Sequence, residues 1–205
     1  MRILKFIFLI FLLFFSCEKS FKYSEKKDKN FTNIYLDIEN LVGNLTIYGG
    51  NKYLCEIKKV GLMGNISTNF NQKDFYINLI NFTGESEIFL DKKKNIYIKS
   101  LISGGSLKLS SKMKVEELFC EMNSGYLYID NASIKKIVIT NNFGDIKIKI
   151  GKSNPVRLKL SSFVSYLNIP ESFVMSNDYF YYLNEEEGLI DMDIYVNMGK
   201  LEILF

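Results

Sequence analysis

The chain contains no histidine and no tryptophan, and only three cysteines. Without histidine it cannot build a catalytic triad with an imidazole base, a histidine proton shuttle or a zinc site with histidine ligands. Neither the phosphate-binding pattern GxxxxGKS/T nor the nucleophile pattern GxSxG occurs in the sequence. We therefore expect no catalytic residues, no cofactor and no metal site, and we interpret the protein as non-enzymatic.

A surplus of charge of either sign is also lacking. Without residues 1–16, which include Arg2 and Lys5, 24 basic residues face 23 acidic ones, a net charge of +1. This balance predicts no nucleic-acid partner and no cation-storage function. Isoleucine, phenylalanine, tyrosine, lysine and asparagine are abundant, as in proteins from AT-rich genomes, so we assign no function to the aromatic residues.

The first seventeen residues, MRILKFIFLIFLLFFSC, have the layout of an export signal. Arg2 and Lys5 form a basic head, residues 6–15 are all apolar, and Ser16 is small. The apolar run is shorter than the roughly 20 residues of a comfortable membrane span. The sequence therefore predicts an exported protein.

The stretch Leu13–Cys17 resembles the bacterial lipobox in the looser form found in spirochaete lipoproteins, because Leu13 lies one residue earlier than in the strict pattern. The resemblance implies a lipoprotein signal peptide over residues 1–16 and lipidation, such as palmitate, at Cys17. An acylated cysteine would anchor the protein to a membrane of the cell envelope, with the outer membrane favoured. An ordinary cleaved signal or an uncleaved anchor is the alternative.

Residues 18–32, EKSFKYSEKKDKNFT, are charged and show no apolar periodicity. Such a segment buries too little apolar surface to offset the entropy of ordering it. We expect residues 17–32 to comprise the lipidated cysteine and a flexible tether, whose lysines could touch anionic headgroups or serve only as a solvated spacer. The folded domain is then expected over residues 33–205.

A short unit recurs about every twenty residues in this domain: a small residue, then two aliphatic residues that alternate with variable ones. Examples are GNLTI at 43–47, GSLKL at 105–109 and GKLEI at 199–203. Successive anchors lie 19 to 22 residues apart, except for one spacing of 34. The first aliphatic residues of the eight units are Leu45, Ile66, Ile88, Leu107, Leu127, Ile146, Leu167 and Leu201.

The residues nine positions before these anchors are apolar in all eight units. They are Leu36, Ile57, Leu79, Ile98, Leu118, Ile137, Leu158 and Met192. Within each unit apolar and polar residues alternate, which indicates half-buried strands, and no segment of the domain favours a helix. We predict an all-β fold, a β-solenoid of about eight two-strand repeats with a turn at each small residue. A β-sandwich is the alternative.

The spacing of 34 residues results from an insertion over residues 170–189, which is rich in aromatic and acidic residues. It could be a lid that carries binding, or a long turn whose tyrosines pack on the end of the stack, and we favour the turn. Cys55 and Cys120 fall three units apart, about 14 Å along a stack of strands, whereas a disulfide needs α-carbons within about 7 Å. We predict two separate buried thiols.

Small residues punctuate the strands as SGG at 103–105, NSG at 123–125 and NFG at 142–144. This rhythm resembles the bacterial putative-adhesin domain, a toast-rack-like β-solenoid found in exported or membrane-tethered proteins, over roughly residues 33–205. The resemblance implies the fold and a role in surface attachment, and it supplies no catalytic motif.

Two groups of charged residues remain as candidate sites. Glu185, Glu186 and Glu187 precede Asp191 and Asp193, two acids on one strand face that could bind calcium weakly or form a solvated acidic edge, as we expect. Four lysines at outward strand positions could meet an acidic partner or a polysaccharide, or could guard the sheet against aggregation, which we favour. They are Lys147, Lys149, Lys159 and Lys200.

These observations favour a lipid-anchored, non-enzymatic envelope protein that acts as an adhesin-like binding module, with a protein or polysaccharide partner. One alternative is a structural or envelope-stress module that faces the periplasm. Another is a small outer-membrane β-barrel, because its strands would also alternate and the chain ends in Phe205.

Overall fold

The computed structural model describes residues 21–26, 31–60, 64–110, 113–130, 133–162, 166–176, 178–182 and 189–205. All regular elements in these residues are strands, and they form one mixed sheet of fourteen strands. The all-β fold class is therefore confirmed. No helix in the described part of the chain has the length and apolar character needed to cross a bilayer.

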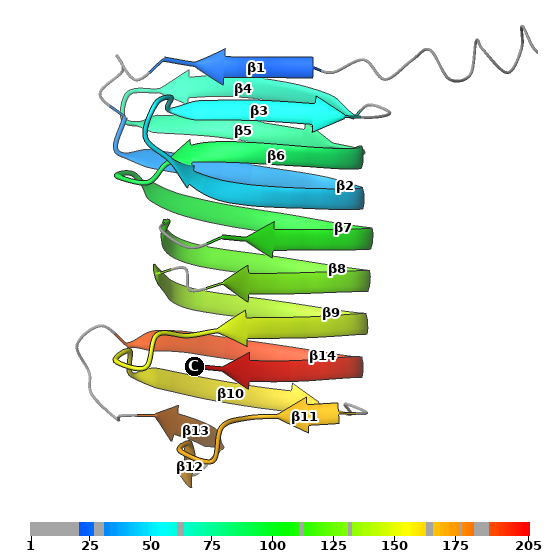
Figure 1. Cartoon of the computed structure of the whole chain (residues 1–205), viewed down its shortest axis with the longest axis vertical. Coiled ribbons are helices and arrows are strands. Elements are labelled where there is room, and N and C mark those ends of the chain that lie inside the picture. Colours follow the sequence, from blue (N-terminus) through cyan, green and yellow to red (C-terminus); the bar gives the residue numbers. More distant parts are fainter. Residues whose placement is uncertain are drawn as a thin grey trace, which may run out of the picture.

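The strands are β1 Phe21–Glu25, β2 Asn33–Gly50, β3 Cys55–Val60, β4 Asn65–Asn71, β5 Asp74–Ile80, β6 Thr83–Asp91, β7 Asn95–Leu109, β8 Lys114–Asp130, β9 Ser133–Lys149, β10 Val156–Ser162, β11 Tyr166–Asn168, β12 Val174–Ser176, β13 Tyr179–Tyr182 and β14 Ile190–Leu204. Five of them, β2, β7, β8, β9 and β14, are 15 to 18 residues long. These five parallel strands are stacked one beside the next along the long axis of the molecule, so each strand runs across that axis. Each bends near its middle (Figure 1).

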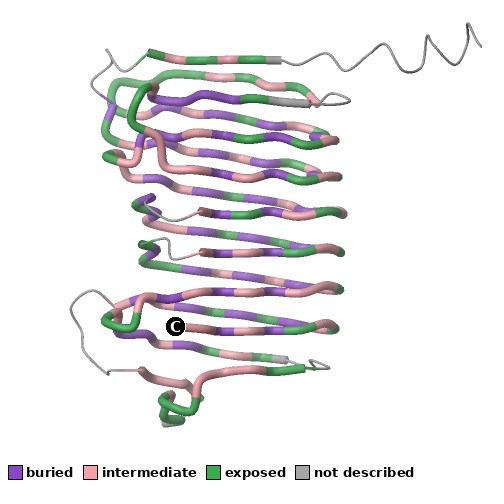
Figure 2. The backbone as a smooth tube through the Cα atoms, viewed as in Figure 1, coloured by how far each residue is buried: buried purple, intermediate pink, exposed green. Residues whose placement is uncertain are grey.

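The bend divides each long strand into two halves that face each other across the core. Residues that point between the halves are buried, and those that point outward are half-buried or exposed, so buried positions recur at alternate residues along most of each long strand (Figure 2). The core therefore takes its side chains from alternate positions of both halves, as the period of two in the sequence predicts.

The parallel register brings the predicted aliphatic columns together. Leu36 pairs with Ile98, Ile98 with Leu118, Leu118 with Ile137, and Ile137 with Met192, which pairs with Leu158. Five residues of the anchor column form a second parallel ladder, to which Leu167 of β11 adds a sixth rung. They are Leu45, Leu107, Leu127, Ile146 and Leu201. Of the twelve residues in the two ladders, all except Leu167 are buried.

Two of the eight predicted units do not follow this register. Ile88 lies beside Ile47 and Leu79 beside Ile38, each two residues away from the predicted neighbour, and Ile57 and Ile66 lie on antiparallel strands. A shift of two residues keeps the same side chains pointing inward, so the alternation cannot distinguish the two registers.

A column of glycines forms the bend. Gly84, Gly43, Gly105, Gly125, Gly144 and Gly199 lie on successive strands, and all have positive φ. A β-carbon on Gly105 would lie 2.0 Å from the carbonyl oxygen of Gly43. The backbones approach too closely at the bend for any side chain, which explains the glycine at the start of the repeats at 43, 105, 125, 144 and 199.

The expected tether is shorter than predicted, because Phe21–Glu25 is strand β1 and pairs antiparallel with β3. Residues 17–20 and 27–30 lie outside the described residues. The sheet therefore begins twelve residues before the predicted start of the domain at residue 33. The alternation in FKYSE is too short to separate a strand from a charged spacer.

Both ends of the long stack are closed by short antiparallel strands. At one end β3 pairs with β6 and β4 with β5, and at the other end β12 and β13 pair with each other and β13 with β10. The ring of Tyr182, which lies within the insertion at 170–189, is 4.3 Å from the ring of Phe205 at the end of the chain. The described part of the insertion thus forms the antiparallel strands β12 and β13 instead of the favoured turn, although Tyr182 packs at the end of the stack as expected, and β14 returns between β9 and β10.

Cys55 and Cys120 are buried free thiols, as the repeat spacing predicted. Burial raises the pKa of Cys120 to about 11 and that of Cys55 further. Both thiols are therefore protonated core residues at neutral pH.

Candidate binding site

Three tyrosines form a ladder on the outer face of the first strand halves, on neighbouring strands β5, β2 and β7. The ring of Tyr35 lies 5.0 Å from that of Tyr76 and 4.7 Å from that of Tyr97, and all three rings are nearly parallel. The parallel register produces this ladder, since it aligns Tyr35 with both neighbours. Burial raises the pKa of Tyr35 above its usual value, so its hydroxyl remains a hydrogen-bond donor at neutral pH.

A β-bulge ends the ladder on the next strand. Ile96 pairs with Val115 and Tyr97 with Glu117, so β8 has one extra residue, Glu116, at this point. The bulge places Glu117 opposite Tyr97 on the neighbouring strand. Bulges of this kind often redirect side chains next to functional sites.

A hollow of about 500 Å³ lies beside the tyrosine ladder. One wall is formed by Tyr35, Tyr76 and Tyr97, and the other by the next outward column of side chains. This second column runs across the same strands and contains Asn78, Asp37, Lys99 and Phe119. The backbone at Leu36 and Ile98 lines the hollow between them. We call this feature the tyrosine hollow.

A second hollow of about 470 Å³ lies on the other side of the same column and shares Asp37, Lys99 and Phe119 with the first. Its remaining lining includes Glu39 and Glu121. The first halves therefore have an outer face with two adjacent hollows. That face is turned away from the viewer in Figure 1, where the second halves lie in front.

Several polar groups of the tyrosine hollow have no hydrogen bond or ion pair with any described residue. These groups are the Asp37 carboxylate, the Asn78 amide, the Lys99 ammonium and the hydroxyls of Tyr35 and Tyr97. The Tyr76 hydroxyl makes only a long contact of 3.4 Å to Asp74. The hollow thus presents donors and acceptors next to the carbon edges of aromatic rings.

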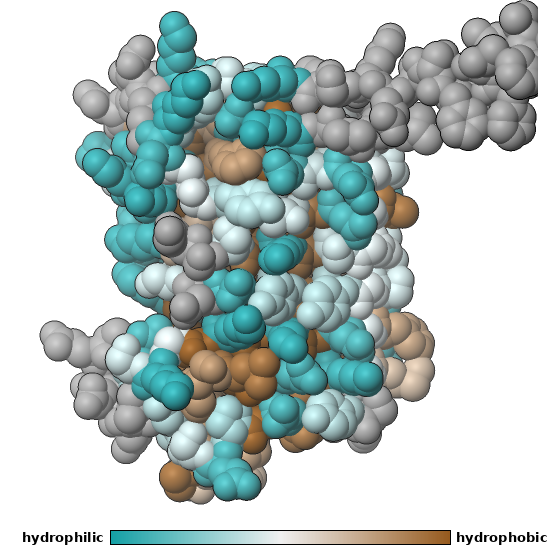
Figure 3. All heavy atoms as spheres, viewed as in Figure 1, coloured by the Kyte–Doolittle hydropathy of each residue, from teal (hydrophilic) through white to brown (hydrophobic). Residues whose placement is uncertain are grey.

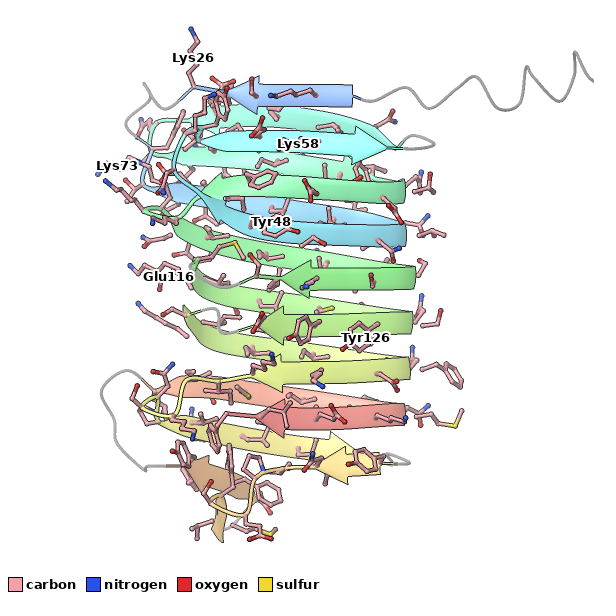
Figure 4. All side chains as sticks on the ribbon, in the orientation of Figure 1. Lys26, Tyr48, Lys58, Lys73, Glu116 and Tyr126 are labelled. Atoms are coloured by element: carbon pink, nitrogen blue, oxygen red, sulfur yellow. The ribbon has the colours of Figure 1, made fainter. Side chains whose placement is uncertain are left out.

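Some outward charges elsewhere on the stack are paired between neighbouring strands. Lys147 lies 3.0 Å from Glu202, and Lys136 lies 2.7 Å from Glu117, which lines the hollow. Glu116 is flanked by Lys135 at 2.7 Å and Lys114 at 3.1 Å, on the side of the molecule opposite the bends (Figure 4). The hydrogen bond from Lys135 is the main cause that lowers the pKa of the Glu116 carboxyl. Asp37 and Lys99 of the tyrosine hollow belong to none of these pairs.

The structure pairs one of the acidic residues singled out by the sequence. Arg157 donates from Nε to Asp191 Oδ1 at 3.0 Å and from a terminal nitrogen to Oδ2 at 2.8 Å. Asp193 is exposed on the same strand, and Glu185, Glu186 and Glu187 lie outside the described residues. In the described residues no three histidine, cysteine or acidic side chains gather where a metal could bind.

The four lysines from the sequence analysis do not form a free basic row. Lys147 pairs with Glu202, and Lys149 lies 3.7 Å from Asp130 and over the ring of Tyr128. Lys159 and Lys200 are exposed. On the face drawn in Figure 3, hydrophilic side chains dominate the upper part and apolar ones gather below the middle. Cys17, the predicted lipidation site, lies outside the described residues.

The tyrosine hollow was not predicted from the sequence, because the abundance of aromatic residues was explained by the composition typical of AT-rich genomes. A signal was present, since IYL at 34–36, FYI at 75–77 and IYI at 96–98 place a tyrosine before an inward aliphatic residue each time. The shifted register of the third unit concealed it. In the predicted alignment Leu79 was matched to Leu36, which moved Tyr76 out of the column.

No protein-family model matches the chain, and no curated protein matches it. Among solved structures, it resembles a putative cell adhesion protein from Clostridium sporogenes with a TM-score of 0.78 and 21% identity, over 91% of this chain and 98% of that one. Putative adhesins from Bacteroides fragilis and Parabacteroides distasonis align with TM-scores of 0.33 and 0.26, each at 10% identity. They cover 92% and 91% of this chain and 98% and 96% of their own.

Those two TM-scores are too low to support an argument. The similarity to the Clostridium sporogenes protein, with its TM-score of 0.78, shows a shared fold. At 21% identity it shows nothing about function. The all-β architecture expected from the sequence is therefore found in a solved structure of nearly the same extent.

Proposed function

We propose that this protein is a lipid-anchored, non-enzymatic binding module of a bacterial cell envelope, in which a β-solenoid holds an adhesin-like binding face. The observation that carries the proposal is the tyrosine hollow, where Asp37, Asn78 and Lys99 have no hydrogen bond or ion pair with the described residues and lie beside half-buried aromatic rings. Pockets that combine aromatic walls with a few convergent polar groups are typical of binding sites. The fold of the Clostridium sporogenes cell adhesion protein agrees with a binding function.

The rigid stack is suited to this role. The hollow lies on strands β5, β2, β7 and β8, where each described backbone is held between neighbours, so its side chains have fixed spacing. Preorganised groups lose little entropy when a partner binds. A binding function also does not require histidine, which the chain lacks.

The lipid anchor would hold one end of the stack close to the membrane. Three residues separate Cys17 from Phe21, where β1 begins. An extended chain spans at most about 3.6 Å per residue, so β1 would start within roughly 15 Å of an acylated cysteine. The hollow begins at β5, near the same end of the stack as β1, so it would lie on the part of the stack that is closer to the bilayer (Figure 1).

Two measurements on bacteria that express the full chain test this proposal. Metabolic labelling with a fatty acid should mark the protein, and Cys17→Ser should abolish both the label and partition into the detergent phase. Protease added to intact cells should degrade the protein while a periplasmic control protein survives. Protection on intact cells, with digestion after the outer membrane is permeabilised, would instead support a structural or envelope-stress module that faces the periplasm.

A further inference from the structure

We infer that the tyrosine hollow binds a neutral oligosaccharide whose chain lies along the stack, across strands β5, β2, β7 and β8. The inference rests on the proposed binding function and names its ligand class. It follows from which groups the hollow offers, from their net charge and from the absence of free backbone groups at the hollow.

The hollow offers side-chain donors and acceptors of both kinds. Asp37 supplies an acceptor, Lys99 supplies donors, and Asn78 and the hydroxyls of Tyr35 and Tyr97 can do both. None of these groups has a partner among the described residues. A ligand that carries many hydroxyl groups can satisfy all of them, and its C–H surface can pack against the tyrosine ring edges.

The charges of the hollow balance one another. Asp37 and Lys99 are opposite residues on neighbouring strands β2 and β7. The third charged side chain, Glu117, is paired with Lys136 at 2.7 Å. A strongly charged ligand would gain from one partner and lose at the other, whereas an uncharged hydroxylated ligand can hydrogen-bond to both.

A peptide strand fits the hollow less well than a sugar. Peptides often bind by adding a strand to a sheet edge, where unpaired backbone groups are available. Here β2 lies between β5 and β7, and β7 lies between β2 and β8, so the backbone is already engaged on both sides. Recognition of a ligand must therefore come from the side chains that line the hollow.

The shape of the site favours a chain over a single sugar unit. Its walls cross four strands that are spaced about 4.8 Å apart, so the hollow extends roughly 15 Å along the stack. The adjacent hollow lies beside it on the same face, across the column of Asp37, Lys99 and Phe119. A linear oligosaccharide could contact the tyrosine ladder with several successive units.

The test uses the purified full chain in detergent and an immobilised panel of neutral oligosaccharides, from disaccharides to hexasaccharides of glucose, galactose, mannose and N-acetylglucosamine. We expect at least one linear member to bind, with affinity that rises with length and does not change when sodium chloride is added, because the ligand carries no charge to screen. Isothermal titration with the soluble sugar then gives the dissociation constant.

Two variants of the hollow should weaken this binding without disturbing the fold. Asp37→Asn keeps the side-chain shape and should raise the dissociation constant about tenfold or more, the usual effect of losing a charged acceptor. Tyr35→Phe keeps the stacked ring and removes the hydroxyl, with an expected rise of about fivefold. The matched control is Tyr48→Phe, a ring that stacks on Phe89 at 5.0 Å on the opposite outer face (Figure 4).

Other outcomes would overturn the inference. Binding that survives both hollow variants, or that falls as strongly with Tyr48→Phe, would place the sugar elsewhere. Binding that weakens steeply with salt would indicate a charged ligand. If no neutral oligosaccharide binds while intact cells that display the protein still adhere to a protein-coated surface, the ligand class is wrong and the proposed binding function stands.

Discussion

Replacement of Gly105 by alanine tests the glycine column that bends the strands. Gly105 has a φ of +105° and lies between Gly43 and Gly125 of the neighbouring strands. An added β-carbon would lie 2.0 Å from the oxygen and 2.5 Å from the nitrogen of Gly43. Both atoms belong to the backbone, so the contact cannot be relieved by rotation of a side chain.

Two costs add in this variant. A non-glycine residue in this part of backbone space costs on the order of 1–3 kcal/mol. Displacement of a packed neighbour costs about 1–3 kcal/mol more. We therefore expect the free energy of unfolding to fall by about 2–6 kcal/mol, a large part of the roughly 5–15 kcal/mol that holds an ordinary domain folded.

Urea unfolding followed by circular dichroism measures this loss, and the midpoint should fall by about 1–2 M. Gly104→Ala is the matched control, because its β-carbon would meet only Ser124 Oγ at 3.7 Å and its φ lies outside the left-handed region. It should change stability by less than about 1 kcal/mol. Equal losses in the two variants would refute the argument that close backbone approach at the bend requires glycine.

Three further predictions follow from the core and the ion pairs. Leu118→Ala should lower the free energy of unfolding by about 2–5 kcal/mol in the same urea assay, because the side chain is fully buried, and a loss below 1 kcal/mol would contradict the aliphatic ladder. Cys55 and Cys120 should react with a thiol reagent at pH 8 only after unfolding, since burial keeps both protonated, and labelling of the native protein would show the burial to be wrong. The lowered pKa of Glu116 means that its contribution is present above its ordinary value of 4.5 and is lost as the pH falls through the lower folded value. Glu116→Gln should therefore cost up to about 1 kcal/mol at pH 7 and less at pH 3, and an equal cost at both values would contradict the ion pairs with Lys135.

Much of the fold could be predicted from the sequence, because it depends on local rules. The alternation of apolar and polar residues predicted strands, and the small residue before each aliphatic pair predicted a turn, which the structure places at the bend of the glycine column. The columns headed by Leu36 and Leu45 were aligned correctly on the five long parallel strands β2, β7, β8, β9 and β14. The spacing of the cysteines likewise predicted separate thiols.

The register near the first end of the stack could not be predicted in the same way. Ile88 and Leu79 shift by two residues, and the strands that contain Ile57 and Ile66 run antiparallel. Inward and outward positions are preserved by both changes, so the hydrophobic pattern has the same appearance in either case. Which strands become neighbours is decided by how the ends of the stack are closed.

The amino-acid sequence by itself determined which side chains enter the core and where the chain bends, since alternation and glycine act through the local backbone. Only the tertiary structure decided that β2 lies between β5 and β7 and that β14 lies between β9 and β10. That order stacks Tyr76, Tyr35 and Tyr97, which are far apart in the chain, and leaves Asp37 and Lys99 unpaired beside them among the described residues. The candidate site arises from strand neighbours, and neighbours are set by non-local packing, which no local pattern encodes.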